Sequence, residues 1–206
     1  FNSHHSYERA MHLGLDTDCQ VHIIPPSAKW AFHNTIIVKK EVKRKILFIG
    51  RLDQNKRIIE VMDAMRDHPK YELIISGNGP LKENVLQIIS QHPKCSFTYY
   101  ENLDSIELAK VLANCGLLCV PSDYESFGLV YIESLCMGVP IIGFRESVKF
   151  IDSCLELQSG VQVNGTIKES IGIAIDKLES NFWDASDLSR KARNFFNPYR
   201  QAKELA

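Results

Sequence analysis

The stretch that decides the fold is Ser122-Asp-Tyr-Glu-Ser-Phe-Gly-Leu-Val-Tyr-Ile-Glu-Ser-Leu-Cys-Met-Gly-Val-Pro140. It follows a short apolar run, Gly116-Leu-Leu-Cys-Val-Pro121, which is typical of a buried strand. Apolar residues then recur at helical spacing from Leu129, and Gly138-Val-Pro140 ends the helix. The stretch therefore predicts a strand, a loop and a helix. The first N–H groups of such a helix are unpaired and carry partial positive charge, which suits a phosphate.

Two glutamates stand out in this stretch. Glu125 lies in the loop on the expected ligand side, and Glu133 lies about two turns into the helix. On spacing alone, Glu133 is expected to be an exposed helical carboxylate. The surrounding pattern, with a strand before it, Phe127-Gly128 at the turn and another apolar strand after it, favours a role in binding instead.

The rest of the chain alternates between apolar runs and amphipathic segments. Five runs are typical of buried parallel strands, and a sixth would form an edge strand: residues 46–49, 71–75, 96–100, 116–120, 140–143 and 159–163. Helical periodicity follows the first four runs and returns at 166–179, at 184–195 and after Pro198. The pattern predicts an α/β fold, a doubly wound, Rossmann-like parallel sheet with helices on both faces.

The N-terminal part lies outside this alternation. Phe1 to Leu15 is expected to be helical, with Ser3 or Ser6 as its cap and Gly14 at its end. Residues 20–24 predict a short strand stopped by two prolines, and residues 27–38 predict a connecting loop. Because the first residue is not Met, we expect the sequence to begin inside a longer protein.

Composition narrows the class of protein. The 206 residues are 45% hydrophobic and 24% charged, which is typical of a soluble globular domain. A formal net charge of −1 argues against a nucleic-acid partner. The charge run Lys39-Lys-Glu-Val-Lys-Arg-Lys45 is either a solvated approach to a strand, which we prefer, or an attraction to an anionic membrane face.

The cysteines argue against a metal site. Cys19, Cys95, Cys115, Cys119, Cys136 and Cys154 form no Cys-x-x-Cys pair, and no histidine stands at zinc-ligand spacing from them. Cys119 and Cys136 fall at apolar positions, where a cysteine is usually a small core residue. We expect no metal, and a reducing cytoplasmic location, with contact to the cytoplasmic face of the membrane through the full-length protein left open.

The ligand is expected at the carboxyl ends of the strands, where the strand order of such a sheet reverses. Polar or small residues occupy four of the turns there: Gly50-Arg51 with Lys56, Gly77-Asn-Gly79, Tyr100-Glu-Asn102 and Glu125-Ser-Phe-Gly128. An arginine and a lysine opposite a helix N-terminus would enclose a diphosphate, and carboxylates would accept the hydroxyls of sugars. A nucleoside diphosphate sugar fits this picture, whereas a dinucleotide cofactor is disfavoured because the glycine loops do not match G-x-G-x-x-G.

Several motifs, in order, resemble one family. The stretch Pro121–Pro140 resembles the E-x7-E signature of retaining GT-B glycosyltransferases of family 4. Ile46–Lys56 is similar to the family's apolar strand followed by Gly-Arg-Leu and a lysine, and Ile75–Leu81 to its Gly-x-Gly-Pro turn. His22-Ile-Ile-Pro25 and Phe195-Phe-Asn-Pro-Tyr199 resemble its flanking segments. The resemblance implies one half of a GT-B architecture, a single C-terminal nucleotide-sugar-binding domain over residues 1–206. Residues 1–25 and about 184–206 would pack toward an N-terminal domain of the same polypeptide.

The resemblance also implies roles for individual residues. Arg51 and Lys56 would hold the donor diphosphate beside Gly50 and stabilise the leaving group without a metal or other cofactor. Glu125 would bind the transferred sugar, Glu133 the ribose, and the base would lie near Tyr100. Backbone N–H groups at the turn would meet phosphate or sugar oxygens, those of Phe127, Gly128 and Leu129. The implied reaction transfers a hexose with retention from an NDP-sugar, for which we expect UDP, to a glycan, lipid or protein.

Departures from the family pattern leave alternatives open. Ser126 stands where the family often has glycine, and Phe144-Arg-Glu-Ser147 stands where it often has Gly-Gly. The N-terminal domain that would supply the acceptor site is absent, so we expect this chain alone to bind donor weakly and transfer little. A non-catalytic nucleotide-sugar-binding partner module is one alternative. Another GT-B enzyme, such as an epimerase or a phosphorylase, is a second.

Overall fold

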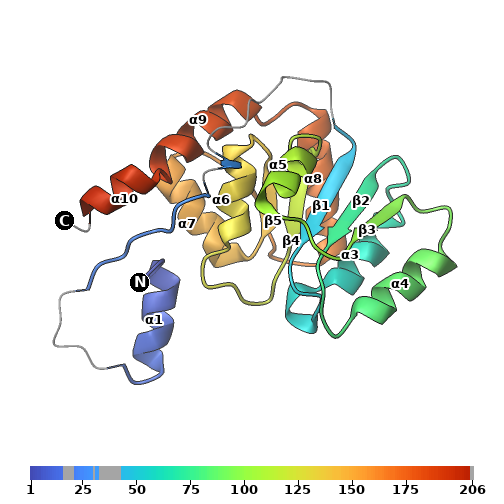
Figure 1. Cartoon of the computed structure of the whole chain (residues 1–206), viewed down its shortest axis with the longest axis horizontal. Coiled ribbons are helices and arrows are strands. Elements are labelled where there is room, and N and C mark those ends of the chain that lie inside the picture. The colour runs from blue at the N-terminus through green and yellow to red at the C-terminus, as the bar shows by residue number, and fades with distance from the viewer. Residues whose placement is uncertain (16–20, 30, 33–42, 205–206) are drawn as a thin grey trace.

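The protein folds around a six-stranded parallel sheet (Figure 1). The structure, a computed structural model, describes residues 1–15, 21–29, 31–32 and 43–204. The strands are β1 (Lys45–Ile49), β2 (Glu72–Ser76), β3 (Phe97–Tyr100), β4 (Leu117–Val120), β5 (Ile141–Gly143) and β6 (Gly160–Gln162). Their order is β3-β2-β1-β4-β5-β6, and every pairing is parallel. The strand order therefore reverses between β1 and β4, and the predicted fold class is confirmed.

Helices cover both faces of the sheet. The covering helices are α3 (Ile58–Met65), α4 (Lys82–Gln91), α5 (Ser105–Leu112), α6 (Leu129–Cys136), α7 (Arg145–Leu155), α8 (Ile167–Glu179) and α9 (Ala185–Phe195). Helices α1 (His4–His12) and α10 (Pro198–Glu204) lie near the two ends of the chain, and the 3-10 turn η1 (Gln54–Lys56) precedes α3. Successive strand side chains alternate between the faces. Leu47 belongs to the core under α5, α6, α7 and α9, while Ile46 and Phe48 belong to the core under α3, α4 and α8.

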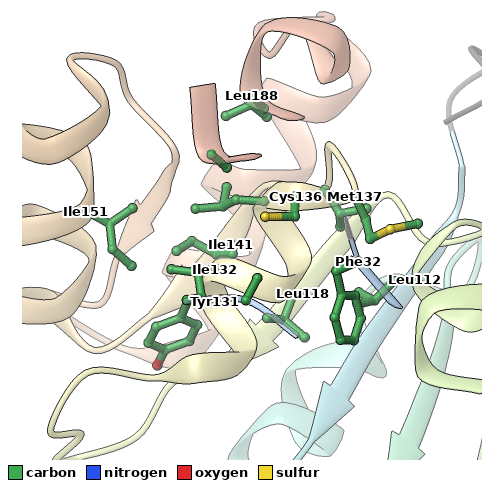
Figure 2. Packing of buried hydrophobic residues seen from close by; sticks show 14 of the residues in the cluster. Phe32, Leu112, Leu118, Tyr131, Ile132, Cys136, Met137, Ile141, Ile151 and Leu188 are labelled. Carbon is green, nitrogen blue, oxygen red and sulfur yellow. The ribbon is translucent and has the colours of Figure 1, made fainter. Parts of the chain in front are cut away.

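Helix α6 is central to the first of these cores. Figure 2 shows its Ile132 and Cys136 among Leu118, Ile141 and Leu188. Cys136 and Cys119 are fully buried, as expected for core cysteines. Burial raises the pKa of the Cys136 thiol to about 12, so this sulfur stays protonated at neutral pH. Because six of the eight residues of α6 are buried, the loop before it is attached to a rigid helix.

The N-terminal helix begins and ends where expected. Ser3 caps α1 by accepting a hydrogen bond from the Ser6 N–H at 3.2 Å, which decides between the two candidate caps. Gly14 follows the helix at φ +89°. Of the charge run 39–45, residues 39–42 lie outside the described part. Lys43 donates to the Ala113 carbonyl at 2.5 Å, and Lys45 pairs with Glu72 at 2.9 Å.

Three parts of the fold differ from the expectation. Residues 21–24 do not form the predicted strand, and Gln20 lies outside the described residues. Ile24 instead donates to the Phe1 carbonyl at 2.8 Å, and two prolines that lack an N–H follow, so no ladder extends. Helix α7 has no counterpart among the expected elements, because Phe144 at its start provides no capping side chain. In the predicted loop 27–38, Ala31 and Phe32 are helical and Phe32 is fully buried; residues 30 and 33–38 are not described.

Membrane-spanning helices and groups of metal-binding side chains are both absent from the described residues. Among the described residues, no helix has both the length and the apolar character needed to cross a membrane. Within the same residues, no three or more His, Cys, Asp or Glu side chains gather so that they could hold a metal ion.

Candidate functional site

The turn after β1 and the loop after β4 are joined at the point where the strand order reverses. The Lys56 ammonium forms an ion pair and hydrogen bond with the Glu125 carboxylate, and both side chains are largely buried. The Asn55 side chain donates to the Tyr124 carbonyl and accepts from the Tyr124 N–H, both at 3.1 Å. The Asn55 carbonyl also accepts from the Asp123 N–H at 2.9 Å. The fold thus brings together Lys56 and Glu125, two predicted site residues that are 69 residues apart in the sequence.

Contacts with residues close in the sequence fix the position of Lys56. The Asp53 carboxylate caps η1 by accepting from the Lys56 N–H at 3.1 Å. Gly50, at φ +152°, lies beside the Lys56 stem, since a Cβ there would be 3.8 Å from Cε. The turn after β2 packs directly on it, because a Cβ on Gly77 would lie 1.9 Å from the Gly50 carbonyl oxygen. The glycines of the first two turns therefore let two backbones approach closely.

Arg51 occupies the same rim and pairs with Asp53, whereas Lys56 pairs with Glu125. The Arg51 side chain is 69% exposed, and its Nε lies 3.3 Å from Asp53 Oδ2. It borders an open hollow of about 520 Å³ at the ends of β1, β2 and β3, lined in part by Gly50, Asn78 and Glu101. Tyr100, at the end of β3, precedes Glu101, and its carbonyl accepts from the Gly77 N–H at 3.1 Å. The hollow therefore borders the turn near which the resemblance predicts the base, and that role of the turn stays a prediction.

The start of α6 closes the other side of the site. Gly128 precedes the helix at φ +87°, and a Cβ there would meet the Tyr131 ring at 2.2 Å, so glycine is required. Phe127 is buried edge-on between Phe150 and Phe196, whereas Leu129 is half exposed. In the described part of the chain, no side chain caps this helix. The Tyr131 N–H donates to the Gly128 carbonyl at 2.9 Å, whereas the N–H groups of Leu129 and Val130 have no partner among the described residues and remain available to an anion.

Glu133 is buried, so the expectation of an exposed helical carboxylate is wrong. The residue is only 5% exposed, and no described residue donates a hydrogen bond to its carboxylate. Burial raises its pKa, and the Lys29 ammonium, 3.9 Å from Oε1, lowers it in part. Lys29 lies before the Rossmann-like unit in a stretch without periodicity, and no sequence signal points to it. A buried carboxylate with spare acceptor capacity suits a diol.

Tyr131 links the loops on this side of the sheet. Its hydroxyl donates to the Val120 carbonyl at 2.6 Å and accepts from the Phe144 N–H at 3.1 Å. Burial raises the pKa of this hydroxyl, which keeps it a donor. The Tyr131 hydroxyl therefore fixes the distance between the end of β4 and the start of α7. The sequence did not single out Tyr131, because it occupies a position that looks like any other apolar position of the helix.

Comparison with known proteins identifies the family. The family model described as "Glycosyl transferases group 1" matches residues 32–195. The chain belongs to this family. The match includes the turn with Arg51 and Lys56 and the stretch with Glu125 and Glu133, while the individual roles of these residues remain predictions.

The proteins that the chain resembles are longer than the chain. An uncharacterized 41.2 kDa protein in the cps region of Klebsiella pneumoniae is 35% identical over 149 residues, which cover 71% of this chain and 40% of that protein. Sucrose-phosphate synthase from Thermosynechococcus elongatus matches with a TM-score of 0.77 at 20% identity, over 97% of this chain and 54% of that one. The pneumococcal O-GlcNAc transferase GtfA, in complex with UDP and GlcNAc, matches with a TM-score of 0.73 at 17% identity, over 98% of this chain and 42% of that one. The chain thus spans about two fifths to one half of these proteins.

Proposed function

We propose that this chain is the donor-binding half of a retaining glycosyltransferase that transfers a hexose from a nucleoside diphosphate sugar to a glycan, lipid or protein acceptor. The observation that carries the proposal is the Lys56–Glu125 pair, which lies at the reversal of strand order beside the start of α6. A cation, a helix N-terminus and a carboxylate are the groups that a diphosphate and its attached sugar require together.

Donor binding exchanges partners within this pair. Without ligand, the Lys56 ammonium neutralises the Glu125 carboxylate. A diphosphate between Lys56 and the α6 N-terminus takes the ammonium as its own partner, which frees Glu125 to accept hydrogen bonds from sugar hydroxyls. As the glycosidic bond breaks, Lys56 and the helix end stabilise the negative charge that develops on the leaving diphosphate, and we propose that no metal is needed. Arg51 joins them when it leaves Asp53.

The remaining parts of the donor have places on the same rim. Glu133, buried and without a hydrogen bond from any described residue, accepts the ribose diol. The hollow beside β1, β2 and β3 takes the base. We expect the nucleotide to be UDP, which is supported by the UDP in the complexes of GtfA and of Anabaena HepE, two proteins with a similar fold.

Calorimetric titration of the chain with UDP, GDP, ADP and their glucose conjugates tests the proposal. We expect heat of binding for one nucleotide and its glucose conjugate, and we expect that nucleotide to be UDP. A response to none of the six compounds would overturn the proposal and favour a module that kept the family fold without the donor site.

A further inference from the structure

Helix α1 lies against the loop that carries Glu125 (Figure 1). Two hydroxyls at its start lie within hydrogen-bond distance of the same acceptor: Ser3 Oγ is 2.8 Å and Ser6 Oγ 2.9 Å from the Ser126 carbonyl oxygen. The single Ser6 hydroxyl proton is shared between this carbonyl and Asn2 Oδ1, which lies 2.7 Å from the Ser6 Oγ. The carbonyl of the residue after Glu125 is therefore held by a segment about 120 residues earlier in the chain.

The residue before Glu125 is held by the same helix. The His5 ring lies 5.6 Å from the Tyr124 ring and 5.4 Å from the Phe144 ring, measured between centroids. The Arg9 guanidinium lies 4.2 Å above the centroid of Tyr124. Aromatic and cation–π contacts of this kind fix a ring without a directional bond. Helix α1 thus contacts Tyr124 and Ser126, on either side of Glu125.

These contacts contribute little to the core. None of the nine residues of α1 is buried, and the helix otherwise touches α7, where His4 packs edge-on against Phe150 at 5.9 Å. From the opposite side, Asn55 holds the backbone of Tyr124. The loop is therefore fixed between two elements, and Glu125 lies between the two points of attachment.

We propose that the segment Ser3–Arg9, here called the α1 clamp, is a positioning element that holds Glu125 against Lys56 before the donor arrives. Ser3 and Ser6 act through the Ser126 carbonyl, and His5 and Arg9 act through the Tyr124 ring. A carboxylate that is already in place loses less conformational freedom on binding, so a clamped loop binds donor more tightly. The consequence for donor affinity rests on the proposed function, whereas the hold on the loop does not.

Amide hydrogen exchange of the whole chain tests the hold on the loop. The reporters are the Asp123 and Tyr124 amides, because both donate to Asn55 and neither contacts a substituted side chain. Loss of both hydroxyls in Ser3→Ala/Ser6→Ala is expected to speed their exchange about tenfold. Ser3→Thr/Ser6→Thr restores slow exchange, because the hydroxyls return. Ser90→Ala removes a hydroxyl bonded to the Gln87 carbonyl on α4 and serves as the matched control.

Two further variants leave the Ser3 cap of α1 intact. Ser6→Ala removes one bond to Ser126, and Arg9→Met keeps most of the aliphatic stem but removes the cation above Tyr124. We expect each to speed exchange of the two reporters about threefold, and Lys177→Met, which removes a cation above Phe182 at 4.3 Å, to leave them unchanged. Unchanged reporters in both α1 variants, with α1 still helical by chemical shift, would overturn the clamp.

Donor affinity separates the clamp from the function. Ser3→Ala/Ser6→Ala is expected to weaken binding of the UDP-sugar about fivefold, with recovery in the threonine variant. If reporter exchange quickens while this affinity stays the same, the positioning role is wrong although the proposed function stands. If the unaltered chain binds no nucleotide, the proposed function fails, and the exchange rates alone decide whether the clamp exists.

Discussion

Nζ of Lys56 and Oε2 of Glu125 form an ion pair that closes the gap between the first and fourth turns of the sheet. Both side chains are about four fifths buried, so salt and water screen the pair less than a surface pair. Under the proposed function, the pair responds differently to two ligands: free UDP competes with Glu125 for Lys56, whereas a UDP-sugar uses both.

Glu125→Gln is expected to bind UDP more tightly and to lose the contribution of the sugar. Removal of the carboxylate leaves the Lys56 ammonium without its partner, so the diphosphate gains about 0.5–1 kcal/mol of attraction. Calorimetry with UDP and UDP-glucose measures both effects. Glu60→Gln, which opens the Arg57–Glu60 pair on α3, is the control. Weaker UDP binding in Glu125→Gln would contradict the exchange of partners.

Lys56→Ala is expected to weaken nucleotide binding by about 1–3 kcal/mol, the cost of a hydrogen bond to a charged group. Arg51→Ala is expected to cost less, because its exposed guanidinium must leave Asp53 before it can contact the ligand. Lys168→Ala, which breaks a surface pair with Asp67, controls for the loss of one positive charge. The same affinity in all three variants and the unaltered chain would remove Lys56 from the donor site.

Glu133→Gln is expected to stabilise the chain at neutral pH and to weaken nucleotide binding. Burial raises the folded-state pKa of Glu133 above its unfolded value, so the carboxyl contributes stability below the unfolded pKa. That contribution is lost as pH rises through the folded pKa. Urea unfolding of both proteins should therefore give matching stabilities near pH 3 and a gain for the variant at pH 7.

Lys29 provides the independent check on Glu133. Its ammonium lowers the pKa of this carboxyl, so Lys29→Met should shift the pH at which Glu133 titrates upward. NMR titration of the Glu133 side chain reports the shift directly, with Lys149→Met on α7 as the charge control. A downward shift would mean that Lys29 does not act on this group.

Asn55→Ala is expected to destabilise the loop after β4 and to weaken donor binding together. The side chain makes two hydrogen bonds to the Tyr124 backbone, and their loss costs about 1–3 kcal/mol when the groups stay partly buried. Thermal unfolding and nucleotide affinity should both fall, whereas Asn114→Ala, whose amide donates to the Lys110 carbonyl, should change neither by a comparable amount. Full affinity in Asn55→Ala would show that Lys56 and Glu125 meet without this bridge.

The sheet could be predicted because buried parallel strands are continuous apolar runs. β1, β4 and β5 lie within one residue of their expected bounds, and the edge strand β6 is present although shorter. Helix α7 was not predicted because it begins without a capping side chain. The strand at residues 20–24 was over-predicted because apolar residues need a neighbouring ladder to become a strand.

The site could be predicted only in part. Lys56 and Glu125 lie at turns that topology brings together, so their proximity follows from the order of the strands. Asn55, Lys29 and Ser3 contact the site through single side chains whose partners are far away in sequence. The sequence around a polar residue in a turn does not indicate such a distant partner, so only the three-dimensional structure shows the contact.

The interlocked glycines after β1 and β2 limit how donor preference can be re-engineered. No substituent larger than hydrogen fits at Gly77, since it would collide with the Gly50 peptide, and Gly79 meets the Leu52 backbone in the same way. The backbone of these two turns, which lines the hollow in part, is therefore fixed. Under the proposed function, a library intended to change the accepted nucleobase should vary Asn102, which borders the hollow, and keep Glu101, which accepts a hydrogen bond from the Asn78 amide of the turn at 2.7 Å.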